Sequence, residues 1–411
     1  MPESILPITD VTGGLAESAS FGPANSMAKS WGVDYRSEPG VFKLARTLIA
    51  EEDQTGDIDD LILWYVMDND GDVYAQGNTG RLYARPSGGV VYDLIKAVSG
   101  STGEGLGIHT IASTRYLLYA QDAALGRVAL PDAVSGSTFT DAYQTLTSDD
   151  FHPIEVLSNL ATIGNGVNLA TIDDSGNFDS DRLELGTGFH IRSMSVMGEW
   201  LVMGAWRGKN FYTGEGRLYF WDGSYGNWNS FLPIPAGGPS LVVGSPDGLL
   251  VVAGGQGTIY MGNRGGIRQV RNIPKDWTQS LDLDGVVALN PGAGCYSDGL
   301  YYLGVGAGAS SLTAAGNTTA EDVKEGVYTF GSASAYQSAS MNLEHRIEAD
   351  DAGTHDIGCV RKFGPNDLFV SHKKTVSGPT TTYYAKRMAT TTTTYGTGST
   401  HAGVVNTQFQ D

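Results

Sequence analysis

Three aspartates alternate around a glycine near residue 70, and their spacing is the first in the chain that suggests chemistry. They are Asp68, Asp70 and Asp72, with Gly71 at the turn. Carboxylates at alternate positions of a tight loop can converge on one calcium ion, which prefers several oxygen ligands. The bidentate glutamate that would close an EF-hand loop is missing, because Thr79 holds its position. The pattern predicts a candidate calcium turn, with a solvated hairpin turn as the alternative explanation.

A second group of candidate residues is aromatic and lies between residues 206 and 228. The group contains Trp206, Tyr212, Tyr225 and Trp228. Aromatic side chains on loops stack on sugar rings and supply much of the binding energy of protein interfaces. We therefore interpret these four residues as candidate contacts to a partner protein or a glycan. Packing between neighbouring structural units is the alternative interpretation.

The sequence contains none of the common catalytic or metal motifs. Its seven histidines show no zinc-ligand spacing, and neither the Gly-x-Ser-x-Gly pattern nor a Walker phosphate loop occurs. Glycine alternates with other residues from Gly103 to Gly107, but the lysine of a phosphate loop is missing, so we expect a plain loop there. Cys295 and Cys359 lie in or beside predicted strands, which indicates two buried thiols, with one bridge between repeats as the alternative. We expect no catalytic activity, and no cofactor apart from the candidate calcium ion.

The overall charge and hydropathy limit the partners of the chain. The formal net charge of −19 disfavours nucleic acid as a partner, because phosphate binding needs a positive field. No run of about 18 apolar residues occurs, so we predict no membrane span. The first residues lack the basic and apolar regions of a signal peptide. We therefore expect synthesis in a cytoplasm without export by that route.

A two-part phrase repeats from about residue 60 to residue 390 and indicates the architecture. A turn with a short apolar run, as in 198–203 and 247–252, is followed by a glycine with a β-rich run, as in 216–221 and 257–261. The middle strands of the predicted units begin near residues 61, 115, 167, 200, 249, 300 and 367. Units of three or four antiparallel strands at this spacing are typical of propeller blades. We predict an all-β propeller of about seven blades, and a pair of β-sandwich domains is the competing fold.

The composition divides the chain into three parts. Residues 1–60 are irregular and are predicted to be an N-terminal arm or docking segment, which packs along the outside of the fold or meets a neighbouring subunit, with a disordered tail as the alternative. Residues 61–390 form the predicted propeller. Residues 391–411 are rich in threonine and glycine and are predicted to be a C-terminal strand or linker, with a strand at 404–409. That strand either pairs back onto the ring or leads into further chain.

The irregular start, with Gly13-Gly14 and the segment 32–40, and the Gly/Thr-rich end complete the pattern. Together with blades that carry no named repeat motif and the missing signal peptide, they resemble the β-propeller structural proteins of tailed-bacteriophage virions. The resemblance implies a non-enzymatic structural protein of a phage tail, nozzle or tip, located in the virion. It implies other virion proteins and copies of the chain itself as partners, and a host surface glycan or receptor as a further contact. It supplies no catalytic residues.

Two other functions are compatible with the sequence. One is a propeller that binds or cleaves glycans, which would place carboxylates beside exposed tryptophan or tyrosine. The other is an intracellular propeller that mediates protein interactions, which would present one partly apolar face to its partner.

Overall fold

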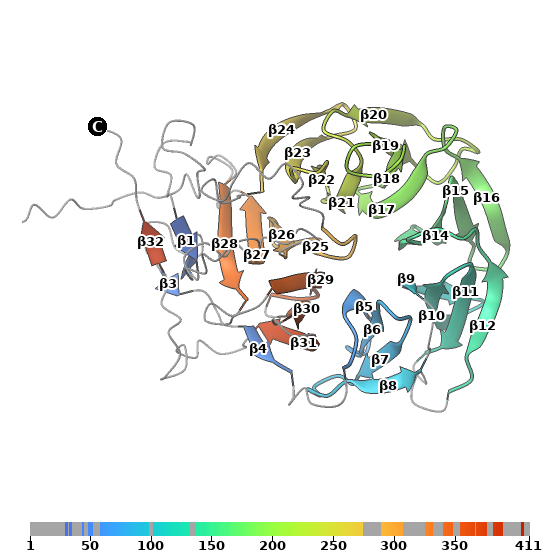
Figure 1. Ribbon diagram of the computed structural model, residues 1–411. Coiled ribbons are helices and arrows are strands. Elements are labelled where there is room, and N and C mark those ends of the chain that lie inside the picture. The colour runs from blue at the N-terminus through green and yellow to red at the C-terminus, as the bar shows by residue number, and fades with distance from the viewer. Residues whose placement is uncertain are drawn as a thin grey trace, which may run out of the picture.

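The computed structural model describes residues 29–31, 33–34, 43–44, 48–51, 58–97, 102–130, 137–273, 289–306, 325–331, 340–347, 354–365, 367–375, 381–388 and 404–406. These residues form strands and turns, and none of them belongs to a helix that could cross a membrane. The strands make a ring of seven antiparallel sheets, which confirms the predicted propeller (Figure 1).

The first four blades follow one another along the chain, each with its first strand innermost (Figure 1). Blade one contains β5 (Ile62–Met67), β6 (Val73–Gly77), β7 (Leu82–Arg85) and β8 (Asp93–Lys96). Blade two contains β9 (Gly103–Ile111), β10 (Thr114–Gln121), β11 (Ala124–Ala129) and β12 (Thr140–Thr145). Blade three contains β13 (Ile154–Leu157), β14 (Leu160–Asn165), β15 (Asn168–Ile172) and β16 (Phe178–Glu184). Blade four contains β17 (His190–Met197), β18 (Trp200–Arg207), β19 (Glu215–Trp221) and β20 (Ser230–Ile234).

The last three blades differ in how they are completed. Blade five contains β21 (Pro239–Gly244), β22 (Leu249–Ala253), β23 (Thr258–Asn263) and β24 (Gly266–Asn272). Blade six contains β25 (Gly294–Ser297), β26 (Leu300–Val305), β27 (Gly326–Gly331) and β28 (Ser340–Arg346). Blade seven contains β29 (Thr354–Lys362), β30 (Leu368–Thr375) and β31 (Thr381–Met388), and its fourth strand is β4 (Leu48–Ala50). A separate pair is formed by β2 (Val33–Asp34) and β3 (Lys43–Leu44).

An N-terminal strand closes the ring. β4 pairs antiparallel with β31, so the outer strand of blade seven comes from a segment that precedes blade one. Directly after β4, the buried Glu51 forms an ion pair of 2.6 Å with the buried Arg85 of blade one. The propeller therefore begins at residue 48, within the predicted arm 1–60, because β4 supplies the outer strand of the last blade.

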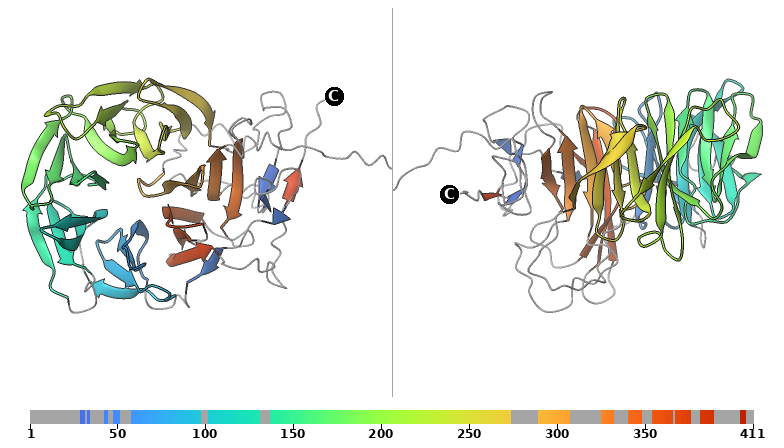
Figure 2. Two further views of the ribbon diagram at one scale, coloured as in Figure 1. Left: turned by 180° about the vertical axis from the view of Figure 1, so that it is seen from behind. Right: turned by 90° about the horizontal axis from the view of Figure 1, so that it is seen from above.

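Both ends of the chain add strands to blade six. β1 (Lys29–Trp31) pairs with β28, and β32 (Val404–Asn406) pairs with β1. Figure 2 shows both strands at the outer edge of that blade. The strand predicted at 404–409 thus pairs back onto the ring, while residues 407–411 lie outside the described residues.

Apolar side chains fill every junction between neighbouring blades. Separate clusters lie between blades one and two, two and three, three and four, four and five, and seven and one, and one large cluster joins blades five, six and seven. Stacking the sheets hides both faces of each blade, which a single four-stranded sheet cannot do alone. Cys295 and Cys359 are buried, free thiols as predicted, and burial raises their pKa values to about 11 and about 12.

Glycine on the inner strands lets neighbouring blades approach closely near the axis. A Cβ atom on Gly105 of β9 would overlap the carbonyl oxygen of His152, which leads into blade three. A Cβ atom on Gly103 would overlap the carbonyl oxygen of Gly77 in blade one. The expected plain loop from Gly103 to Gly107 is therefore wrong: the segment begins an inner strand, where close backbone approach requires glycine.

The glycine requirement can be tested with a matched pair of variants. We expect Gly105→Ala to lower the free energy of unfolding by about 3 kcal/mol or more, because the backbone carbonyl group of His152 occupies the place of the new methyl group. Gly226→Ala is the control, since nothing lies within 4 Å of a Cβ at that position. Denaturant midpoints measure both changes, and equal midpoints for the two variants would contradict the steric explanation.

The closing strand can be tested by two truncations. A chain that starts at residue 61 loses β4 and the Glu51 partner of the buried Arg85, and removing one partner of a buried ion pair costs about 3–5 kcal/mol. A chain that starts at residue 48 keeps both. We expect the first truncation to lower the thermal midpoint far more than the second, as measured by calorimetry. Similar midpoints would show that β4 does not close the ring.

Candidate functional site

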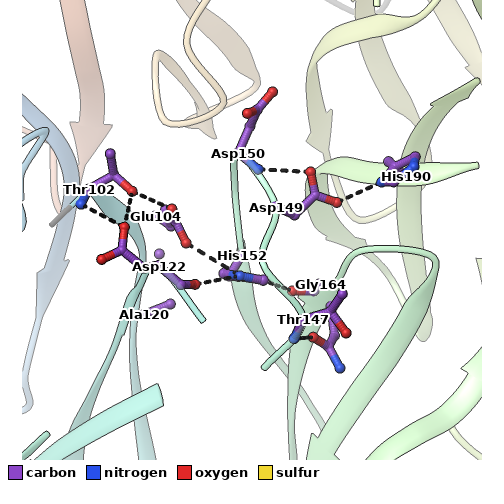
Figure 3. A network of polar contacts seen from close by, with 12 residues as sticks. Thr102, Glu104, Ala120, Asp122, Thr147, Asp149, Asp150, His152, Gly164 and His190 are labelled. Atoms are coloured by element: carbon purple, nitrogen blue, oxygen red, sulfur yellow. Dashed lines mark hydrogen bonds and ion pairs between the residues drawn. The ribbon is translucent and has the colours of Figure 1, made fainter. Parts of the chain in front are cut away.

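Polar and aromatic side chains gather at one end of the ring in blades two to four. This end carries the crossings from an outer strand to the next inner strand and the turns between second and third strands. We call it the crossover face, and in these blades it comprises residues 102, 122–123, 146–153, 166–167, 185–189 and 208–214. The opposite end, with the other two turns of each blade, is called the hairpin face. Figure 3 shows part of the crossover face.

A buried glutamate and a buried histidine meet beneath the crossover face. Glu104 is 3% exposed and His152 is fully enclosed, and the His152 Nε2 lies 3.3 Å from Glu104 Oε2 (Figure 3). The His152 Nδ1 lies 2.6 Å from the carbonyl oxygen of Gly164, and Nε2 lies 3.0 Å from that of Asp122. Both ring nitrogens face carbonyl oxygen atoms, and Glu104 Oε2 has no hydrogen-bond partner among the described residues.

Burial sets the protonation of this pair. It raises the pKa of Glu104 to about 7, although the Thr102 hydroxyl donates a hydrogen bond that acts in the opposite direction. Burial also lowers the pKa of His152, against the effect of its carbonyl partners. The pair therefore favours a neutral carboxyl group beside a neutral imidazole. Its hydrogen bonds stay inside the protein, linking blades two and three.

Asp149 lies above this pair, and both of its carboxylate oxygens have hydrogen-bond partners. Its Oδ2 lies 2.9 Å from His190 Nδ1, and its Oδ1 accepts the backbone N–H of Asp150 at 2.8 Å (Figure 3). The His190 ring lies 6.0 Å from the ring of Trp206 in the neighbouring strand. These contacts connect the entry into β13 with the start of blade four.

An arginine stands between two phenylalanines on the same face. The Arg192 guanidinium lies 4.8 Å from the ring centre of Phe151 and 4.0 Å from that of Phe211. Arg192 is the extra residue of a β-bulge, because Ile191 pairs with Ala205 while Ser193 pairs with Gly204. Bulges turn a side chain away from its regular direction and are frequent beside functional sites. Burial lowers the pKa of Arg192 to about 10, so the side chain stays charged at neutral pH.

The loop that carries Phe211 is held in place by its own contacts. Asn210 Oδ1 accepts the backbone N–H of Thr213 at 2.9 Å, and the Asn210 carbonyl accepts the N–H of Gly214 at 2.9 Å. The N–H of Gly238, at the entry into blade five, donates to the Phe211 carbonyl at 2.8 Å. The aromatic side chains of this loop are therefore positioned before any partner arrives.

The structure separates the four predicted aromatic residues into two pairs. Trp206 and Tyr212 lie at the crossover face, where β18 leads into β19. Tyr225 and Trp228 lie in the turn after β19, at the hairpin face. A seven-residue strand, about 20 Å long, separates the two ends. Trp228 packs edge-on against Tyr219 with a centroid distance of 5.6 Å, whereas Tyr225 is 64% exposed.

The predicted calcium turn lies at the hairpin face between β5 and β6. Asp68 Oδ1 accepts the backbone N–H groups of Asp70 at 2.9 Å and Asp72 at 3.0 Å. Arg115 of blade two binds Asp70 at 2.7 Å. Within the part of the chain that the structure describes, no group of three or more His, Cys, Asp or Glu side chains could hold a metal ion. The hydrogen bonds and the ion pair account for these carboxylates, and calcium binding stays a prediction.

The residues that the sequence analysis missed are Glu104, His152, Phe151, Arg192 and Phe211. Glu104 stands within the glycine-rich segment that was expected to be a loop. Arg192 and Glu104 occupy the same bulge position of their inner strands, which blades one, five and seven fill with uncharged residues, so aligning the inner strands could have found both. His152 and Phe151 carry no comparable signal.

Comparisons with known proteins support the fold. No protein-family model and no curated protein matches the chain. Among solved structures, Raptor of Chaetomium thermophilum is similar with 9% identity and a TM-score of 0.54, over 84% of this chain and 30% of that one. A chain of a mitotic checkpoint complex has 9% identity and a TM-score of 0.51, over 83% and 91%. A structure described as YCF48 bound to D1 peptide has 12% identity and a TM-score of 0.49, over 86% and 98%.

At these identities the likeness shows the fold alone. The fold and the ring of blades define the chain as a seven-bladed β-propeller.

The buried glutamate predicts a pH-dependent effect of one substitution. A raised folded-state pKa contributes stability that is present below the unfolded value of 4.5 and is lost as the pH rises toward 7. A glutamine side chain in this position would not titrate. We therefore expect the unfolding free energy of Glu104→Gln, measured relative to that of the unmodified protein, to increase as the pH rises. Between pH 4.5 and pH 8 this increase should reach up to roughly 3 kcal/mol.

Urea unfolding at several pH values measures this difference. Glu199→Gln, at an exposed glutamate in the turn after β17, is the control and should follow the unmodified protein at each pH. A difference between Glu104→Gln and the unmodified protein that is constant across pH would contradict a raised Glu104 pKa.

Proposed function

We propose that the chain is a non-enzymatic protein-interaction propeller that holds a partner protein on the crossover face of blades three and four. One observation carries the proposal: half-buried aromatic residues from separate segments lie on this face, and two of them hold a cation between their rings. They are Phe151, Trp206, Phe211 and Tyr212, with Arg192 between two of them. Aromatic residues and arginine are the types that dominate the binding energy of protein interfaces.

The closed ring supports this function physically. Strands anchored in a packed ring present the loops of blades three and four in fixed positions, and Asn210 and Gly238 fix the loop of Phe211. A surface ordered in advance loses little conformational entropy when a partner binds. This arrangement favours the interaction propeller among the functions compatible with the sequence.

The virion function rests on the resemblance of the sequence. Assembly into a phage tail, contact with virion partners or a host receptor, and location in a virion remain predictions. The positions of the aromatic residues disfavour a glycan-binding site made of all four. Trp206 and Tyr212 lie at one end of β19, and Tyr225 and Trp228 lie at the other.

A displayed library of random twelve-residue peptides tests the proposed function directly. We expect selected peptides to bind the unmodified propeller and to lose affinity at least about tenfold, or about 1.4 kcal/mol, when Trp206 or Phe211 is replaced by alanine. Titration by fluorescence anisotropy measures the affinities. Tyr225→Ala is the matched control, because it removes an exposed aromatic ring from the hairpin face.

Two outcomes contradict the proposal. One is a library that yields no binder. The other is a set of binders that depend on Tyr225 as strongly as on Trp206, which would show that the crossover face is not selected.

A further inference from the structure

The same bulge position recurs in several blades, and the residue in it differs. In blade one Leu63 is skipped between paired residues, in blade two Glu104, in blade five Ser240, and in blade seven Gly358. In blade four the skipped residue is Arg192. The ring therefore forms with leucine, glutamate, serine or glycine in this position, and the fold does not require a long cation there.

The charge of Arg192 has little to bind within the protein. Its Nε is buried without a hydrogen-bond partner among the described residues, whereas its two terminal nitrogens are not enclosed. The guanidinium makes no hydrogen bond or ion pair with any other described residue and is held by the faces of Phe151 and Phe211. An arginine that is 9% exposed gives up most of its hydration, and unpaired buried donors are costly. The two rings fix the orientation of a cation whose donors remain available.

The neighbouring charges restrict the ligand. Asp149 and Asp150 interact electrostatically with Arg192 and would oppose a strongly charged anion. Both oxygens of Asp149 are already engaged, by His190 and by the N–H of Asp150. Figure 3 shows the Asp150 side chain pointing away from the other residues drawn. A planar group with a single negative charge therefore suits the site better than a phosphate.

We propose that Arg192 binds a carboxylate of the partner segment, an Asp or Glu side chain or a chain end, through its terminal nitrogens between Phe151 and Phe211. This inference rests on the proposed function and names the group that the crossover face recognises. A guanidinium fork matches a carboxylate with two parallel hydrogen bonds, and a site built for such a group rejects the amide analogue.

The test uses small probes and the complete chain. The Nε–Hε signals of the arginines are recorded by NMR in the ¹⁵N-labelled protein. The signal that disappears in Arg192→Ser is assigned to Arg192. We expect acetyl-Phe-Glu-amide to shift this signal saturably, and acetyl-Phe-Gln-amide to need at least about tenfold higher concentration. Inorganic phosphate should bind more weakly than the glutamate peptide. An equal response to the glutamine peptide, or tighter binding of phosphate, would overturn the proposal.

Variants separate binding from folding. Arg192→Ser copies the residue of blade five, so we expect a nearly unchanged thermal midpoint and no binding of selected acidic peptides. Arg192→Lys keeps the charge without the fork and should bind at least about tenfold more weakly. Arg264→Ser is the control, because Arg264 also stacks on an aromatic ring, Trp200, but lies at the hairpin face. Unchanged binding by Arg192→Lys, or equal weakening by Arg264→Ser, would contradict the inference.

The two proposals fail in different ways. Library peptides that require Trp206 but bind equally with Arg192→Ser would leave the interaction propeller intact and refute the carboxylate site. A library without binders refutes the interaction propeller, while the Arg192 signal still reports whether a carboxylate binds.

Discussion

The structure depends on the close approach of the inner strands around the axis of the ring. At Gly103 and Gly105 only a hydrogen atom fits between one strand and the carbonyl oxygens of the next blade. In blade four, serine hydroxyls take this position: Ser193 Oγ accepts the N–H of Val242 at 3.0 Å, and Ser195 Oγ accepts that of Gly244 at 2.8 Å. Backbone groups near the axis are thereby satisfied between blades, because no regular strand pairing connects one blade to the next.

The same constraint determines where side chains of other kinds can lie. Large groups must leave the crowded junctions, either outward into the apolar clusters between blades or toward the axis and the two ends. Glu155 of blade three and Arg361 of blade seven point across the axis and approach to 3.7 Å, although their strands belong to opposite sides of the ring. The bulge at Arg192 sends that side chain to the crossover face. Tight inner packing thus concentrates functional chemistry at the ends of the ring.

The sequence carries enough information for the blades and not enough for the contacts between them. The alternating apolar runs of blades four and five predict their strands closely, because each turn between them is marked by glycine or aspartate. The glycines of 103–107 led to the wrong prediction of a loop. A glycine needed for close approach of two strands cannot be distinguished from a glycine needed for a turn in a single sequence. β4 has three residues, and its partner β31 lies more than 300 positions away, so no local pattern reveals the pairing. The sequence analysis placed Trp206 and Trp228 in one group, although the strand expected between them, β19, carries the chain from one end of the blade to the other.

Two polar groups at the crossover face differ in a way that separates structural from functional roles. Glu104 and His152 are both buried, with Thr102 bound to Glu104 Oε1 and the carbonyl oxygens of Asp122 and Gly164 beside the His152 ring. Glu104 Oε2 has no hydrogen-bond partner among the described residues and faces His152. These contacts lie inside the junction of blades two and three. Arg192 occupies the bulge position in blade four that Glu104 occupies in blade two, and it ends without an acceptor among the described residues. The two residues differ in access, because the terminal nitrogens of Arg192 are not enclosed whereas Glu104 is buried beside His152. This difference is why we assign Arg192 to a partner and Glu104 to the ring.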